Sequence, residues 1–323
     1  MDHDENTDEL HGLPAFDFPA PDEVPELPEP ETVAWRLSCD PYDDSCPDRN
    51  FADCLQRFLD TVDTSRVRAL IFGVWGEAYE DDSSTVIEPL VAAKDRLPSI
   101  EAVFIGDIDA EQAEISWIKQ SDVTRVLDAF PRLRELKIRG GTGLVFPAVT
   151  HEHLHTLRFE SGGLPSAAVR GVCDSELPAL ERLEMWLGVS QYGGDATVAD
   201  LGGLLSEGRF PELRHLGLQN SEIQDEIATA VAAAPIVAQL TSLDLSMGVL
   251  TDAGAEALLA GQPLTHLKAL DLHYNFFSEA MEQRLREALE PSGVELDLSE
   301  KGDEDEDEDD GEVEVWRYTA VAE

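Results

Sequence analysis

A short apolar frame recurs along the chain. Leucine or another apolar residue stands at its first, fourth and sixth positions. Successive first positions, counted from Val67, are 33, 33, 21, 26, 33, 27 and 27 residues apart. Self-similarity at such spacing predicts a repeat protein. Trp35 and Leu37 mark an earlier strand, and Leu296 and Leu298 mark an incomplete last copy. The complete copies are Val67-Leu70-Phe72, Ile100-Val103-Ile105, Leu133-Leu136-Ile138, Leu154-Leu157-Phe159, Leu180-Leu183-Met185, Leu213-Leu216-Leu218, Leu240-Leu243-Leu245 and Leu267-Leu270-Leu272.

Each copy of the frame predicts a strand followed by a helix. The last two apolar residues are two apart, so both face one side of a strand while the residue between them faces the other side. Helix starts are indicated by Ser221 with Gln224, which have capping-box spacing, and by the N-cap candidates Ser121, Thr251 and Ser278. Prolines such as Pro131, Pro178 and Pro211 end the helices. We therefore expect an α/β solenoid with a parallel concave sheet and convex helices.

The ends of such an array need caps, because a lone repeat cannot bury its apolar face. Residues 32–66 are predicted to be the N-terminal cap, with a helix over Phe51–Leu59. Residues 67–299 hold the repeats, and a helix over Ser278–Leu289 with the strand near Leu296 closes them.

The repeat resembles the leucine-rich-repeat superfamily, nearest its ribonuclease-inhibitor-like type. The strand phrase Leu264–Leu272 and the helix opening Val249–Ala255 are typical of it. The resemblance implies a horseshoe-shaped binding scaffold. Three further segments, 76–79, 114–118 and 315–318, resemble an uncharacterised bacterial family of such proteins. Its relatives are often encoded beside radical-SAM and ATP-grasp type enzymes, which implies a biosynthetic-cluster enzyme as a partner.

The net charge of −44 is concentrated at the two ends of the chain. Residues 1–31 hold eleven acids and no lysine or arginine, and residues 300–314 hold eleven acids and one lysine, which leaves about −23 elsewhere. This balance argues against nucleic acids, which bind through basic residues, and against anionic membranes. Basic proteins and cationic ligands remain as partners.

The acidic ends are predicted to differ from the repeats in structure. Residues 1–31 combine acids with six prolines, so we expect a disordered arm. Residues 300–312 form an acidic, self-repelling linker that is also expected to be disordered. Residues 313–323 return to a β-prone composition with Trp316 and Tyr318. They either fold back onto the solenoid or dock a partner, with disorder and no function as the remaining alternative.

The compartment is predicted from what the sequence lacks. No apolar run approaches the roughly 18 residues of a membrane-spanning helix, and Met1–Glu5 have no signal-peptide pattern. The four cysteines show no Cys-x-x-Cys spacing. We expect reduced thiols in the cytoplasm, with a Cys39–Cys46 disulfide as the alternative.

The concave face is the first candidate site. Its predicted residues carry alternating charge around one tryptophan, and buried aromatic and arginine anchors dominate binding at interfaces. A merely solvated face is the alternative. The residues are Phe104, Lys137, Arg139, Arg158, Glu160, Glu184, Trp186, Gln219, Asp244, Ser246, Asp271 and His273.

The loops that follow the strands are the second candidate site. Insertions lengthen three of the repeats, after residues 73, 105 and 187, and insertions at one repeat position line one edge of a solenoid. We expect an aromatic rim there, unless these aromatics plug the loops into the body. The predicted partner-binding residues of both sites are Trp75, Tyr79, Asp107, Trp117, Arg139, Arg158, Glu160, Glu184, Trp186 and Tyr192.

Catalytic and metal motifs do not emerge from the sequence. Gly140–Gly143 lack the Lys-Ser/Thr and the helix of a phosphate loop, and no hydrolase or metalloprotease motif occurs. His151, His153 and His155 alternate without a partner at ligand spacing. We expect no cofactor, no metal and no enzyme activity, but a scaffold or adaptor that binds a protein or peptide. The alternative is a small-molecule sensor or enzyme with a pocket under Trp117 and Trp186.

Overall fold

The structure is a computed structural model that describes residues 6–20, 23, 26–40, 48, 50–206, 208–309 and 312–323. Its main element is a twelve-stranded sheet in which the strands follow one another in chain order, from β1 to β12. All pairs from β2 to β12 are parallel. The repeat strands are β3 (Ala34–Leu37), β4 (Ala69–Phe72), β5 (Ala102–Ile105), β6 (Glu135–Arg139), β7 (Thr156–Glu160), β8 (Arg182–Gly188), β9 (His215–Ser221), β10 (Ser242–Asp244), β11 (Ala269–Asp271) and β12 (Glu295–Asp297).

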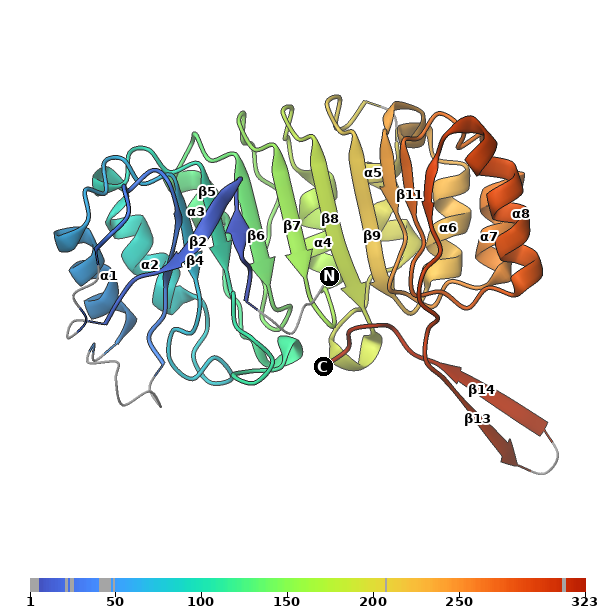
Figure 1. Ribbon diagram of the computed structural model, residues 1–323, viewed down its shortest axis with the longest axis horizontal. Coiled ribbons are helices and arrows are strands. Elements are labelled where there is room, and N and C mark those ends of the chain that lie inside the picture. The colour runs from blue at the N-terminus through green and yellow to red at the C-terminus, as the bar shows by residue number, and fades with distance from the viewer. Residues whose placement is uncertain are drawn as a thin grey trace.

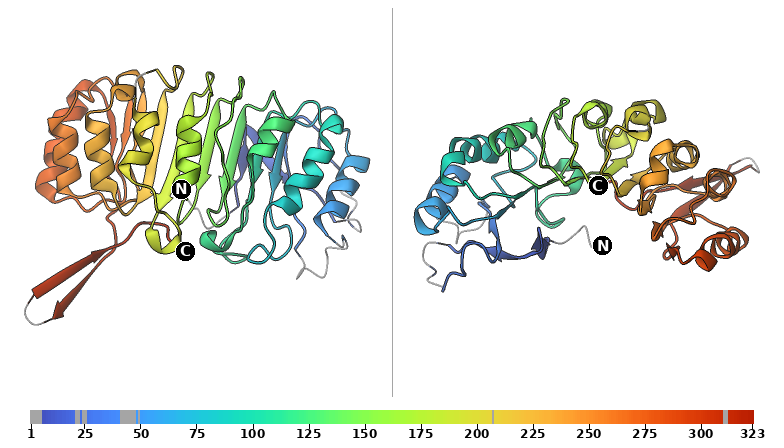
Figure 2. Two further views of the ribbon diagram at one scale, coloured as in Figure 1. Left: turned by 180° about the vertical axis from the view of Figure 1, so that it is seen from behind. Right: turned by 90° about the horizontal axis from the view of Figure 1, so that it is seen from above.

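Helices cover the convex side of this sheet, and the stack curves as a horseshoe (Figures 1 and 2). The α-helices are α1 (Phe51–Thr61), α2 (Ser84–Ala92), α3 (Thr124–Ala129), α4 (Ser166–Asp174), α5 (Gly202–Leu205), α6 (Gln224–Ala232), α7 (Asp252–Ala260) and α8 (Glu279–Leu289). None of the described helices has the length and apolar character needed to cross a membrane.

The frame residues form the core. Equivalent leucines of neighbouring strands, such as Leu136, Leu157 and Leu183, lie in register and are fully buried. They belong to one apolar cluster that extends from Val33 to Leu298. Each fully buried leucine contributes about 1.5–3 kcal/mol. The solenoid predicted from the frame is confirmed.

Several predicted helix starts are confirmed and others are wrong. The cap helix is present as α1, and Thr251 and Ser278 accept hydrogen bonds from Ala253 and Met281 at the starts of α7 and α8. The Ser221–Gln224 capping box is wrong. Ser221 lies in β9, and Gln224 donates to the Leu218 carbonyl, because this buried amide supports the strand end instead.

Ser121 is not an N-cap either. Helix α3 begins three residues later, where Asp122 accepts from the Thr124 N–H at 3.1 Å. The Ser121 hydroxyl instead lies 2.9 Å from that of Ser83, in the preceding repeat. Cys46, the second residue of the alternative disulfide, lies outside the described residues.

The N-terminal segment is not a disordered arm over its described residues. It forms β1 (Glu9–Leu10) and β2 (Leu13–Asp17), and β2 pairs with β3. Leu10 packs in a second apolar cluster with Ile71 and Phe104, on the concave side of the sheet. The acidic, proline-rich composition concealed this apolar contact, which provides the burial that orders the segment.

The C-terminal acidic run is likewise ordered where the structure describes it. Strands β13 (Glu304–Asp309) and β14 (Glu312–Arg317) form an antiparallel hairpin that projects from the solenoid (Figure 1). The predicted disorder is therefore wrong for these residues, because the acidic strand β13 pairs with β14. Arg317 of β14 also forms an ion pair with Glu304 of β13 at 3.2 Å. The hairpin is closed at its base, since the Tyr318 N–H donates to the Asp303 carbonyl.

Candidate functional site

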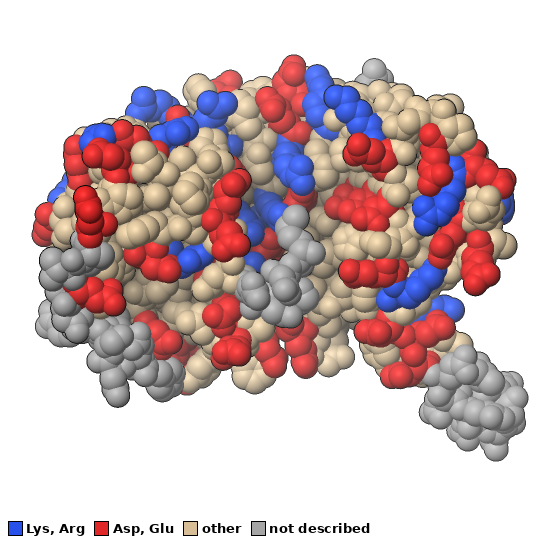
Figure 3. All heavy atoms as spheres, in the orientation of Figure 1, with Lys and Arg blue, Asp and Glu red and all other residues tan. Residues whose placement is uncertain are grey.

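In-register strands stack equivalent concave side chains into rows. The central row changes character along the solenoid, from apolar through an ion-pair network to acidic, as the gathering of basic and then acidic side chains in Figure 3 shows. Residues 9–15 cover the apolar part. The row reads Ile71, Phe104, Lys137, Arg158, Glu184, Gly217, Asp244, Asp271 and Asp297.

Glu160 is the centre of the ion-pair network. Its carboxylate lies 3.0 Å from Lys137, 2.8 Å from Arg139 and 2.9 Å from Arg158, and the residue is 2% exposed. Burial alone would raise the pKa of Glu160, but the charges of the three cations lower it to about 2. Because each cation is already engaged by the protein's own carboxylates, we interpret this network as mainly structural.

Glu184 extends the network to the next strands. It contacts Arg158 at 2.9 Å, His215 at 3.1 Å and Arg182. Burial opposes ionisation, yet the hydrogen bond with His215 and the charges of Arg158 and Arg182 lower the pKa of Glu184 to about 2. The Arg158 guanidinium also stands 5.7 Å from the centre of the Trp186 ring.

The last part of the row is the acid ladder, which we define as Asp244, Asp271 and Asp297. Each first carboxylate oxygen accepts the N–H two residues later, which holds the side chain on the concave side of its strand end. Burial and then the charge of Asp271 raise the pKa of Asp244 to about 6. Within the part of the chain that the structure describes, no lysine or arginine forms an ion pair with the ladder.

A cation is the natural complement of the acid ladder. His273 contacts Asp271 at 2.8 Å, and this hydrogen bond raises the pKa of His273. Ligand atoms of Asp271, His273 and Asp297 lie within 4.8 Å of one another. This spacing would suit a metal ion, although a partner's lysine or arginine meets the same carboxylates without needing a defined ligand geometry.

The insertion-bearing edge holds the chain's last residues. The 3₁₀ helices η2 (Ile115–Trp117) and η3 (Ser190–Tyr192) lie at one edge of the sheet, with the C-terminus between them (Figure 1). We call residues 319–323 the C-terminal tail. Ser116 donates to the Ala322 carbonyl and Tyr192 to the Glu323 carboxylate, so the tail is bound by both insertions.

The structure brings some predicted site residues together and separates others. Arg139, Arg158, Glu160 and Glu184 form the concave network described above. Trp186 is on the same face but only 2% exposed, because it packs against Val321 of the tail.

The predicted aromatic rim is discontinuous. Trp117 is 55% and Tyr79 is 40% exposed, and Tyr192 is half-buried. Trp75 is not on the rim, because it is 1% exposed in the main core and donates to the Asp81 carbonyl at 3.1 Å. Asp107 is also buried and pairs with Arg36 at 2.7 Å, so it ties the insertion to β3.

The alternating histidines do not share a strand face. His151, His153 and His155 precede β7, and each of them lies within hydrogen-bond distance of a backbone carbonyl. Their ring nitrogens are therefore engaged in holding the loop rather than gathered at one point.

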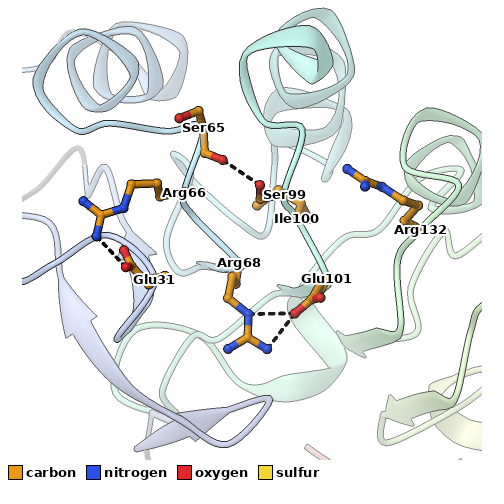
Figure 4. A pocket seen from close by; sticks show the side chains of 8 residues that line it. All are labelled: Glu31, Ser65, Arg66, Arg68, Ser99, Ile100, Glu101 and Arg132. Atoms are coloured by element: carbon orange, nitrogen blue, oxygen red, sulfur yellow. Dashed lines mark hydrogen bonds and ion pairs between the residues drawn. The ribbon is translucent and has the colours of Figure 1, made fainter.

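A pocket of about 380 Å³ lies at the N-terminal ends of β4–β6, opposite the insertions (Figure 4). Three arginines line it, but each is engaged. Arg66 pairs with Glu29 and Glu31, Arg68 pairs with Glu101, and Arg132 donates to the Pro98 carbonyl. An anion would have to displace these carboxylates, so we assign the pocket no ligand.

The structure adds several residues to the predicted site. Asp297 has a readable signal in the sequence, because an aspartate follows the second frame leucine at Leu243, Leu270 and Leu296 alike. Arg182 and His215 gave no such signal. Asn220 carries no local signal of its role, because its contact with Val321 joins positions 101 residues apart.

Comparison with known proteins supports the repeat. A family model described as a leucine-rich repeat matches residues 239–259. A crystal structure of a Bacteroides fragilis protein from a structural genomics consortium is similar over 84% of this chain and 75% of that chain, with 34% sequence identity and a TM-score of 0.76. No curated protein matches the chain.

Proposed function

Since the chain belongs to the leucine-rich-repeat family, we propose that it is a non-enzymatic interaction scaffold that binds a protein or peptide partner through its concave face and its insertion-bearing edge. Leucine-rich-repeat domains generally bind proteins and are generally not enzymes. The partner we propose presents basic side chains to the acid ladder.

The observation that carries this proposal is the acid ladder, whose three carboxylates form no ion pair with a lysine or arginine of the described residues and whose one ion pair there is that of Asp271 with the His273 ring. Asp244, Asp271 and Asp297 repeat one charge on three consecutive strands about 4.8 Å apart. Like charges so close repel each other, and a basic partner relieves the repulsion. Electrostatic complementarity of this kind steers association and selects partners. Exposed Trp117 and Tyr79 at the insertion-bearing edge supply apolar contact area elsewhere on the solenoid.

The narrower proposal is a cytoplasmic adaptor for an enzyme of a biosynthetic cluster. Radical-SAM and ATP-grasp type enzymes are the first candidates, on the strength of the resemblance to bacterial proteins encoded beside them. No observation favours the small-molecule alternative, because Trp186, one wall of its proposed pocket, lies beneath the chain's own tail.

A matched pair of variants tests the proposal. Asp244→Asn, Asp271→Asn and Asp297→Asn together remove the ladder charge, while Glu226→Gln, Glu279→Gln and Glu287→Gln remove equal charge from exposed convex positions. Each variant is tagged and used to recover partners from the native cells. Each ladder carboxylate would lose an ion pair with the partner worth up to about 1 kcal/mol, so the ladder variant should recover about 10- to 100-fold less partner. The convex variant should recover as much as the wild type. Equal recovery by both variants would refute the proposal.

A further inference from the structure

The C-terminal tail is bound as a peptide rather than packed as a part of the core. The Val321 N–H donates to the Asn220 Oδ1 at 2.9 Å, and the Asn220 Nδ2 donates to the Val321 carbonyl at 2.6 Å. The Ala320 N–H donates to the Met247 carbonyl at 2.8 Å. One side chain therefore holds both polar groups of a single residue of the tail, a contact that any residue with an N–H could make.

A small apolar pocket supplies the side-chain preference. Val321 is 1% exposed and packs with Ile115, Trp186 and Met247 in a cluster that is separate from the solenoid core. Beside it, a Cβ on Gly162 would lie 2.0 Å from the Ala322 carbonyl oxygen. We call this site the tail groove, lined by Ile115, Ser116, Gly162, Trp186, Asn220 and Met247.

The solenoid core does not need the tail. The leucine frame buries its own residues without contribution from 319–323. The hairpin is also closed at its base by Asp303 and Tyr318, so the tail can leave without unpairing β13 and β14. Departure of the tail would expose Trp186 and leave the buried amide of Asn220 without its two partners from Val321. The unpaired amide and the exposed Trp186 ring would cost free energy, and an extended segment in the groove removes that cost.

We propose that the tail groove is a binding site for an extended peptide segment of the partner protein, with a valine-sized residue between two small ones, and that the chain's own tail fills the groove when the partner is absent. This inference rests on the proposed scaffold function and adds to it a defined peptide site and its internal competitor. Main-chain hydrogen bonds give affinity in such sites, and the pocket gives specificity.

Competition within one chain sets the size of the expected effect. A tethered segment acts at an effective concentration on the order of 1 mM. A peptide that binds the open groove with a Kd of about 10 µM would then bind the resting chain about 100-fold more weakly.

A labelled peptide with the sequence of residues 317–323 tests the site by fluorescence anisotropy. The full chain carrying Val321→Asp, whose tail cannot bury a charge, should bind the peptide at least 10-fold more tightly than the wild type. A peptide with the same Val→Asp change should bind neither chain. Equal affinity of the two chains, or no binding of the unchanged peptide to the Val321→Asp chain, would overturn the proposal.

Two glycine substitutions in the Val321→Asp chain locate the binding. Gly162→Ala should abolish peptide binding, since its Cβ occupies the position of the ligand's carbonyl. Gly202→Ala, whose added Cβ meets nothing within 4 Å, should leave binding unchanged. Equal effects of the two would contradict the site.

A measurement on the wild-type chain tests the proposal even if the Val321→Asp chain does not fold. In ¹⁵N-labelled wild type, excess unlabelled peptide should accelerate hydrogen exchange at the Ala320 and Val321 amides. Unchanged exchange would also overturn the proposal. The acid-ladder variants keep the tail groove, so the two proposals can fail separately. If the ladder variant loses its partner but the labelled peptide does not bind the tail groove, this inference is refuted and the scaffold function stands.

Discussion

Glu160→Gln is the sharpest test of the concave network. The substitution keeps the side-chain shape but removes the charge shared by Lys137, Arg139 and Arg158. It also places an amide donor against groups that are themselves donors. Of the three cations, Arg158 would keep its contact with the Glu184 carboxylate at 2.9 Å.

The magnitude follows from the pKa of Glu160. A fall from 4.5 to about 2 corresponds to about 3 kcal/mol of preference for the carboxylate in the folded chain. Removing one partner of a buried ion pair costs about 3–5 kcal/mol. We therefore expect the free energy of unfolding to fall by about 3–4 kcal/mol at pH 7.

Urea unfolding followed by circular dichroism measures the loss, with Glu181→Gln, an exposed glutamate before β8, as the control. Because the folded-state pKa of Glu160 is lowered, its contribution is present above pH 4.5 and is lost as the pH falls towards 2. The difference between wild type and Glu160→Gln should therefore shrink to about 1 kcal/mol at pH 3. A loss at pH 7 no larger than that of Glu181→Gln would refute the reasoning.

Two further predictions concern the ends of the same face. The raised pKa of Asp244 favours its protonated form in the folded chain, so that contribution is present below pH 3.8 and is lost as the pH rises through about 6. Asp244→Asn should therefore raise the free energy of unfolding at pH 8 by about 1–3 kcal/mol and give no gain at pH 4, measured by urea unfolding; a loss at pH 8 would contradict the assignment. Leu10→Asp should release the N-terminal strands from Ile71 and Phe104, seen as at least about 10-fold faster proteolysis within residues 6–20, whereas Glu9→Ala should not. Unchanged proteolysis of Leu10→Asp would mean that this contact does not order the segment.

The fold could be predicted because its signal is local and repeated. Leu136, Leu157 and Leu183 each stand in the same six-residue frame, and parallel pairing in register follows from repeating it. The N-terminal strands could not be predicted from the composition of residues 1–31, because that composition is dominated by acids and prolines. The few apolar residues among them, such as Leu10 and Leu13, pack against the apolar concave surface around Phe104.

The site was only partly predictable for a related reason. The frame places Arg139, Arg158, Glu160 and Glu184 on the concave face, and the structure puts them in contact. Which surface the last residues cover depends on contacts across the whole solenoid. The burial of Trp186 by Val321 and the hydrogen bonds of Asn220 could not be obtained from local spacing.

Site-specific photocrosslinking tests most directly whether the partner lies on the acid ladder. A photoreactive residue is placed beside the ladder, at Ser242 in β10 or at Ser299 just after β12, or on the convex helices α7 and α8, at Glu256 or Gln283. Binding at the ladder predicts crosslinks to one partner from the two positions beside the ladder and none from the helices. Crosslinks from the helix positions alone would contradict it.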